Sequence, residues 1–258
     1  MAMNKEAKTI SFANHKGGVG KTTTTASVGS ILSSLGFKVL LIDLDAQANL
    51  TVSLLKDEPD DSIYYALTGK TEALPIVSVT DNLSIVPSSL QLATAEIELT
   101  AALSREHILA GLLEPIKDQF DFILIDCPPS LGLLTLNAFT ASTEIIIPLV
   151  AEVLPFKGLT MINRFTQQVK TRLNPSTYIF GILLTRWEST NLSRQIEQGL
   201  RNELGDKVFK TKIRKNVTIA EAPLESKNIM DYAPRSNGAI DYKAFTYEML
   251  AKLGIAIM

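Results

Sequence analysis

Six short apolar runs recur along this chain of 258 residues. Their apolar residues stand together instead of alternating with polar ones, which is typical of strands buried on both faces of a parallel sheet. Helical segments separate most of the runs, and this alternation predicts an α/β fold: a doubly wound, mostly parallel sheet with helices on both faces. The expected strands are residues 9–14, 38–43, 83–87, 120–126, 144–150 and 177–185. The expected helices are residues 22–35, 90–103, 105–120, 132–141, 157–173 and 192–204.

The composition indicates one globular unit. Hydrophobic residues make up 46% of the chain and charged residues 20%, which is enough apolar material for a large core. Because no Pro, Ser or Gly-rich linker, internal repeat or low-complexity tract divides the sequence, residues 1–258 are expected to form a single domain. The polar segment "KDEPDDS" at residues 56–62 is expected to be a surface loop.

The net charge and the cysteine content limit which partners and which cellular compartment suit this protein. The formal net charge is −2, so any contact with nucleic acid or an anionic membrane requires a local basic patch. Cys127 is the single cysteine, which excludes an intramolecular disulfide and suits a reducing compartment. The N-terminus lacks the apolar core of a signal peptide, and Pro148, Glu152 and Pro155 interrupt the longest apolar stretch. We therefore expect a soluble cytoplasmic protein that does not bind membranes.

A glycine-rich segment, "NHKGGVGKTTTT", connects the first expected strand to the first expected helix. Backbone N–H groups and the positive end of the helix converge there, which favours a phosphate. The lysine and threonine that open the helix suit the β and γ phosphates and Mg²⁺, respectively. The spacing Gly-x-x-x-x-Gly-Lys-[Ser/Thr] would place glycine at His15, and a second lysine follows at once. The predicted nucleotide-binding residues of this loop are Lys16, Gly17, Gly18, Val19, Gly20, Lys21, Thr22 and Thr23, with Thr22 also predicted as a metal ligand.

Carboxylates end two other expected strands. Asp126 ends the run in "ILIDCPPS", where an acid can hold Mg²⁺ through its water shell. Asp43 and Asp45 follow the run in "LLIDLDAQANLT". Two acids near phosphates repel them unless Mg²⁺ or an attacking water lies between, so one of the pair is a candidate to position that water.

Four segments in a fixed order, "KGGVGKTT", "LLIDLDAQANLT", "DCPPSLGLLTLNA" and "NVTIAEAP", resemble the ParA/Soj/MinD family of deviant Walker A P-loop ATPases. The ParA/Soj partition branch is the most similar, and the resemblance runs from Ile10 to about Gly238. It implies slow Mg²⁺-dependent ATP hydrolysis, with ATP/ADP and Mg²⁺ as cofactors, in a homodimer that forms with ATP. It also implies a role in plasmid or chromosome partition, and a ParB-like or cargo adaptor protein that stimulates hydrolysis. The expected location is the bacterial cytoplasm, on the nucleoid when ATP is bound.

The resemblance assigns roles to individual residues. Lys16 is expected to reach the phosphates of the partner subunit, while Lys21 acts within its own subunit. Asp45 matches the family aspartate needed for hydrolysis and Asp126 the Walker B aspartate. Glu152 is either an acid near the dimer interface or a plain surface carboxylate. The base is expected against the loops around residues 185–186 and 213–216, and the predicted contacts are Arg186, Ile213, Arg214 and Asn216, with Arg214 replacing a proline common in the family.

The family binds DNA without sequence preference, but this chain has Ser189 and Thr218 where close relatives carry arginines. The segment "GDKVFKTKIRK" at residues 205–215 offers five basic residues and one acid. Alternating residues of a strand share one face, so the predicted DNA-binding strip is Lys210, Lys212, Arg214 and Lys215. The alternatives are an edge strand protected by charge and, for the whole protein, a ParA/MinD-like ATPase that positions a protein cargo without binding DNA. The C-terminal "EMLAKLGIAIM" has one lysine, which disfavours a MinD-like membrane helix.

Overall fold

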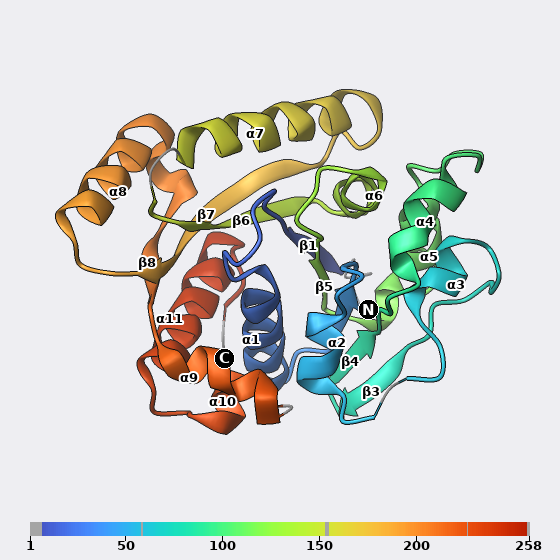
Figure 1. Ribbon diagram of the computed structural model, residues 1–258, viewed down its shortest axis with the longest axis horizontal. Helices are drawn as coiled ribbons and strands as arrows, with labels where there is room; N and C mark the ends of the chain where they lie inside the picture. Colours follow the sequence, from blue (N-terminus) through green and yellow to red (C-terminus); the bar gives the residue numbers. More distant parts are fainter. Residues whose placement is uncertain (1–6, 58, 153–154, 226, 257–258) are drawn as a thin grey trace.

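The computed structural model describes residues 7–57, 59–152, 155–225 and 227–256. It contains one sheet with the strand order β3-β4-β2-β5-β1-β6-β7-β8 (Figure 1). All neighbouring strands are parallel except β3 and β4. The expected α/β fold is therefore confirmed. The strands are β1 (Lys8–Phe12), β2 (Val39–Asp43), β3 (Val77–Thr80), β4 (Leu83–Val86), β5 (Phe122–Asp126), β6 (Glu144–Val150), β7 (Tyr178–Trp187) and β8 (Val208–Arg214).

Helices cover both faces of the sheet (Figure 1). One buried cluster joins the sheet to α4, α5, α6 and α7, and the other joins it to α1 and α11. Every residue of β2 and β5 is buried, as expected for strands with continuous apolar runs. The longer helices are α1 (Lys21–Ser34), α4 (Leu92–Leu99), α6 (Leu133–Ala141), α7 (Pro155–Arg172), α8 (Asn191–Leu204) and α11 (Asn237–Lys252). The shorter ones are α2 (Asn49–Leu54), α3 (Ile63–Leu67), α5 (Ile108–Leu113), α9 (Val217–Glu221) and α10 (Ile229–Tyr232), with 3₁₀ turns at Lys117–Gln119, Gly205–Lys207 and Ala222–Glu225.

Several elements differ from the sequence prediction. The two helices expected at residues 90–103 and 105–120 are shorter: α4 ends at Leu99, and α5 covers only Ile108–Leu113. Between them, Ser104 has a φ of 49°, which no α-helix contains, so the two helices are separate. The C-terminal helix α11 was not predicted, although Tyr242, Phe245 and Met249 recur at helical spacing and are buried. The edge strand β3 was missed because it is only four residues long. No helix of the described residues is long and apolar enough to cross a membrane.

Candidate functional site

The carboxyl ends of three central strands meet at one edge of the sheet. Phe12 of β1 lies in register with Asp126 of β5, and Asp126 lies in register with Asp43 of β2. Since neighbouring strands are about 4.8 Å apart, the two carboxylates are next to each other. The glycine-rich loop leaves β1 at this same edge and leads into α1. The fold thus brings together the loop and the acids that the sequence had placed on separate strands.

The loop conformation requires glycine at two positions. Gly18 has a φ of 71° and Gly20 a φ of 86°, both in the left-handed region that glycine adopts at little cost. A Cβ at Gly17 or Gly18 would meet no heavy atom within 4 Å, so the space in front of these residues is open. Helix α1 begins directly after Gly20 with no side-chain cap. Its first N–H groups therefore have no acceptor within the helix and face an open space, which suits an anion.

Polar contacts hold this loop in place. The Asn14 side chain donates to the Pro148 carbonyl on β6 (2.7 Å) and accepts from the Lys16 amide (3.1 Å). On the other side the Thr185 hydroxyl of β7 donates to the Val19 carbonyl (2.7 Å). The Lys21 side chain is 6% exposed and donates to the Lys16 carbonyl at 3.2 Å. The Lys21 side chain thus lies inside the loop, where its ammonium group contacts the Lys16 carbonyl. The ammonium group has further N–H donors that can bind a ligand.

Asp126 is fully buried, and among the described residues neither of its carboxylate oxygens has a hydrogen-bond partner. Burial, followed by the negative charge of Asp43, raises the pKa of Asp126 well above its usual range, while the adjacent Thr22 hydroxyl and Lys21 ammonium oppose the rise. A buried carboxylate without partners is costly. It fits the position of a ligand to a cation, and together with Thr22 it supplies the oxygen donors that Mg²⁺ prefers.

Asp43 differs from Asp126 although both end a buried strand. It accepts hydrogen bonds from the Asp45 amide (3.1 Å), the Thr51 amide (2.9 Å) and the Thr51 hydroxyl (2.8 Å). Burial raises the pKa of Asp43 to about 6, and the bonds from Thr51 and the Asp45 amide limit the rise. Asp43 therefore stabilises the loop after β2 by accepting these hydrogen bonds. In the sequence, the signal for this structural role is the polar Thr51, eight residues after Asp43.

Asp45 is positioned by that loop. It is half-buried, and one of its carboxylate oxygens accepts from the Gln47 amide at 3.0 Å. Its carbonyl accepts from the Ser88 hydroxyl at 2.8 Å. The second carboxylate oxygen has no partner in the part of the chain that the structure describes. Asp45 is therefore the acid of this pair that remains available to a water molecule.

Comparison with known proteins identifies the family. A family model described as an AAA domain matches residues 7–179. The sporulation initiation inhibitor protein Soj of Bacillus subtilis is 41% identical to this chain over 249 residues, 95% of this chain and 98% of that protein. The chain belongs to the ParA/Soj family. The chromosome-partitioning ATPase Soj of Treponema pallidum is 39% identical over 250 residues, covering 96% of this chain and 98% of that protein.

A solved structure has a similar fold. The crystal structure of cobyrinic acid a,c-diamide synthase from Mycobacterium smegmatis, with bound ADP and magnesium, has a TM-score of 0.83 and 33% identity, and covers 96% of each chain. The resemblance inferred from the four sequence segments is confirmed.

Lys16, the additional lysine of this ParA/Soj loop, is 46% exposed at its side chain. Its Nζ lies 4.0 Å from Glu152 Oε2, and that carboxylate is also exposed. An ion pair of this length in solvent holds the lysine weakly. Lys16 therefore stands beside the open loop, free to turn toward another anion.

His15 rests against helix α7. A Cβ added at Gly158 would lie 2.2 Å from His15 Cε1, so no side chain fits there without moving the ring. We predict that Gly158→Ala displaces the glycine-rich loop and lowers ATP affinity about tenfold, consistent with an overpacking cost of about 1–3 kcal/mol. Titration with a fluorescent ATP analogue measures this. Gly111→Ala in α5 is the matched control, because a Cβ there meets nothing within 4 Å. Equal affinity of Gly158→Ala and the parent would contradict the prediction.

The predicted base-binding residues have different environments. Arg186 has a φ of 49° and donates to the Gly18 carbonyl at 3.3 Å, so it lies beside the loop. Asn216 caps α9 by accepting from the Thr218 amide (3.0 Å) and hydroxyl (2.7 Å). The side chain of Ile213 is buried in the core, and Arg214 forms a bidentate ion pair with Asp241, closest at 2.7 Å. The structure thus brings Arg186 to the glycine-rich loop and engages the Ile213 and Arg214 side chains elsewhere.

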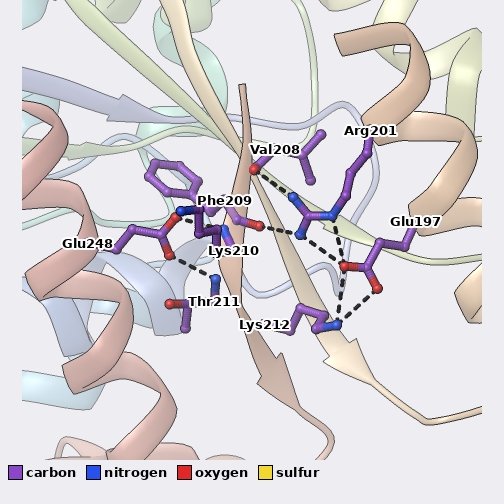
Figure 2. Close-up of polar contacts among 8 residues, drawn as sticks. All are labelled: Glu197, Arg201, Val208, Phe209, Lys210, Thr211, Lys212 and Glu248. Atoms are coloured by element: carbon purple, nitrogen blue, oxygen red, sulfur yellow. Dashed lines mark hydrogen bonds and ion pairs between the residues drawn. The ribbon is translucent and has the colours of Figure 1, made fainter. Parts of the chain in front are cut away.

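Three residues of the predicted DNA-binding strip, Lys210, Lys212 and Arg214, lie on β8 at an edge of the sheet, and Lys215 directly follows the strand. Most of its cations have acidic partners: Lys212 pairs with Glu197 (2.9 Å) and Lys215 with Glu188 (2.9 Å). Figure 2 shows Lys212 directed toward Glu197 of α8, and the amides of Lys210 and Thr211 bound by Glu248 of α11. Together with the Arg214–Asp241 pair, these contacts leave Lys210 as the strip cation without an acidic partner among the described residues.

Proposed function

We propose that this ParA/Soj chain hydrolyses ATP slowly with Mg²⁺ at the glycine-rich loop, and that ATP assembles two copies into a dimer. The observation that carries the proposal is the buried Asp126 carboxylate, which lies near Lys21 and Thr22. Its oxygens accept no hydrogen bond from any residue that the structure describes. The open space before Gly17 and Gly18 supports it, because a phosphate would occupy that space. Relatives named as chromosome-partitioning ATPases support the role in plasmid or chromosome partition.

Different residues of the site have different roles in phosphoryl transfer. The first amides of α1 and the Lys21 ammonium bind the β and γ phosphates, and the anchored loop keeps them fixed before the reaction. Thr22 and Asp126 would hold Mg²⁺, which neutralises charge on the phosphate oxygens when bound. Asp45 orients the attacking water with its free carboxylate oxygen. This is catalysis by position and charge, which is compatible with a slow intrinsic rate.

Lys16 acts on the phosphates of the partner subunit in this proposal. Its exposure and its weak contact with Glu152 support that role, since a γ-phosphate at an open loop lacks charge compensation on its outer side. We predict that Lys16→Ala weakens ATP-dependent dimerisation at least tenfold and leaves ATP binding by the monomer nearly unchanged. Light scattering with and without ATP measures the first effect, and nucleotide titration the second. The exposed Lys227→Ala is the control, and a Lys16→Ala protein that dimerises like the parent would contradict the role in trans.

The partners belong to the same proposal. The ATP-bound dimer binds duplex DNA without sequence preference in the cytoplasm, on the nucleoid, and a ParB-like or cargo adaptor protein stimulates hydrolysis. The strip Lys210, Lys212, Arg214 and Lys215 is one candidate contact surface, although three of its four cations would first leave a carboxylate.

A second candidate function is positioning of a protein cargo without DNA. Ser189 and Thr218, together with the ion pairs of the strip, favour it. The purified protein tests both candidates: Mg²⁺-dependent ATP hydrolysis and ATP-dependent dimerisation are expected in either case, and binding of random-sequence duplex at 50 mM salt only in the first. A protein that neither hydrolyses ATP nor dimerises with it would overturn both.

A further inference from the structure

Helix α7 carries cations without acids. Lys157, Arg164, Lys170 and Arg172 are all exposed on it, and none forms an ion pair with any described residue. No aspartate or glutamate occurs in the sequence between Glu152 and Glu188, although the chain has 27 acidic residues. An acid-free helix with four charges is therefore a local departure from a protein whose net charge is −2.

The apolar side of α7 is already occupied. Leu159, Ile162 and Val169 are buried in the core cluster beneath the helix, so α7 is a fixed part of the sheet's cover. Figure 1 shows it as the long helix on the face of the sheet opposite α1 and α11. Its outward side is thus a rigid, solvent-exposed surface whose composition is not needed for packing.

The β8 strip offers a contrast. Around the strip, five carboxylates lie on or beside it: Glu188, Glu197, Asp206, Asp241 and Glu248. A polyanion that approached β8 would have to break those pairs and would meet the acids themselves. On α7 itself it would meet exposed cations and no carboxylate, so the electrostatic free energy of contact favours α7.

We propose that the solvent face of α7 is the main surface by which this protein contacts the phosphate backbone of duplex DNA. The inference rests on the DNA-binding part of the proposed function and replaces the β8 strip as its site. Charge complementarity is the first reason. The second is that the same face presents the amides of Asn163, Gln167 and Gln168, all exposed, and amide donors beside Lys and Arg are typical of backbone contacts that carry no sequence information.

The spacing agrees with such a contact. Lys157 and Arg164 are seven residues apart, so they lie on one side of the helix with about 10 Å between their Cα atoms. Arg172 continues the basic surface by a further 12 Å or so along the axis. The helix therefore presents its charges over several successive phosphates, and long flexible side chains adjust to their exact positions.

The test is fluorescence anisotropy of random-sequence duplex with the ATP-bound protein over 50 to 200 mM salt. For Arg164→Gln/Arg172→Gln we expect a loss of affinity of roughly 10- to 100-fold near 100 mM salt, and a salt dependence reduced by about one phosphate contact for each cation removed. Glutamine has a helix propensity close to that of lysine and arginine, so the helix persists. Arg164→Lys/Arg172→Lys keeps the charges and should bind like the parent.

Two further variants complete the design. Lys227→Gln/Lys243→Gln makes the same change in net charge away from α7 and should bind like the parent. Equal binding by the parent and Arg164→Gln/Arg172→Gln would overturn the α7 assignment while leaving DNA binding intact. Loss of binding in Lys210→Gln/Lys215→Gln alone would return the site to β8. If the parent dimerises with ATP but binds no duplex at 50 mM salt, both the α7 assignment and the DNA part of the proposed function fail. If that protein binds poly-glutamate through α7, the partner of the α7 face is an acidic protein.

Discussion

Lys21→Ala is expected to abolish ATP hydrolysis, with a loss of at least 100-fold in kcat, the scale of removing one transition-state donor. Lys21 is the buried cation of the loop: its side chain is 6% exposed, and its Nζ is held 3.2 Å from the Lys16 carbonyl. No other lysine or arginine of the described chain is buried in this way, so none substitutes for it. Steady-state ATP hydrolysis with Mg²⁺ measures this loss, and nucleotide titration shows whether ATP still binds.

A second substitution at this position separates the effect of losing the charge from the effect of losing side-chain packing. Lys21→Met keeps an apolar stem in the buried position and removes only the ammonium group, so it should be as inactive as Lys21→Ala while unfolding at nearly the parent temperature. The exposed Lys227→Ala should be as active as the parent. An active Lys21→Met protein would show that the loop does not use this cation, and the proposed reading of the site would be wrong.

Asp45→Ala is expected to trap the ATP-bound dimer. Removing the carboxylate that orients the attacking water should slow hydrolysis roughly 100-fold or more, the usual effect of losing one acid–base group. Because ATP then persists at the interface, the dimer should survive size-exclusion chromatography with light scattering, whereas the parent returns to monomer as ATP is consumed. The free oxygen of Asp45 is the structural basis, since its other oxygen is bound by Gln47.

Asp81→Ala is the matched control, since Asp81 is exposed in the turn between β3 and β4, far along the chain from the loop. It should hydrolyse ATP and dissociate like the parent. If Asp45→Ala stays monomeric with ATP while it binds the nucleotide normally, the dimer model fails even though the ATP site stands.

DNA binding through α7 and ATP hydrolysis at the glycine-rich loop depend on different residues. The ATP site depends on Asp126, Thr22 and Lys21 at the centre of the sheet. The α7 surface is the solvent-exposed side of a helix that covers the sheet, and it contributes none of these groups. A protein that positions a cargo without DNA would therefore keep every prediction made for the ATP site and lose only those made for α7.

Much of the architecture is local and could be predicted. The continuous apolar runs of β2 and β5 place apolar side chains on both faces of each strand, so exposing either face to solvent would be unfavourable. Such strands are expected at the centre of a parallel sheet. The glycines of the loop allow positive φ at Gly18 and Gly20, and the residues after them begin a helix. Edge strand β3 and the short helices between β2 and β4 carry too few residues for a clear period, which is why they were missed.

The roles of the charged residues were decided by contacts between distant segments. Asp43 and Asp126 both end buried strands and look equivalent in sequence. Thr51 donates hydrogen bonds to Asp43, whereas Asp126 has no hydrogen-bond partner within the described segments. Lys212 and Arg214 form a basic pattern in sequence, but Glu197 and Asp241 from α8 and α11 neutralise them. The cations of α7 pair with no acid in the part of the chain that the structure describes. A sequence determines which charges exist and where a strand or helix holds them, whereas the free energy of a charge depends on the groups that folding brings within a few ångströms of it.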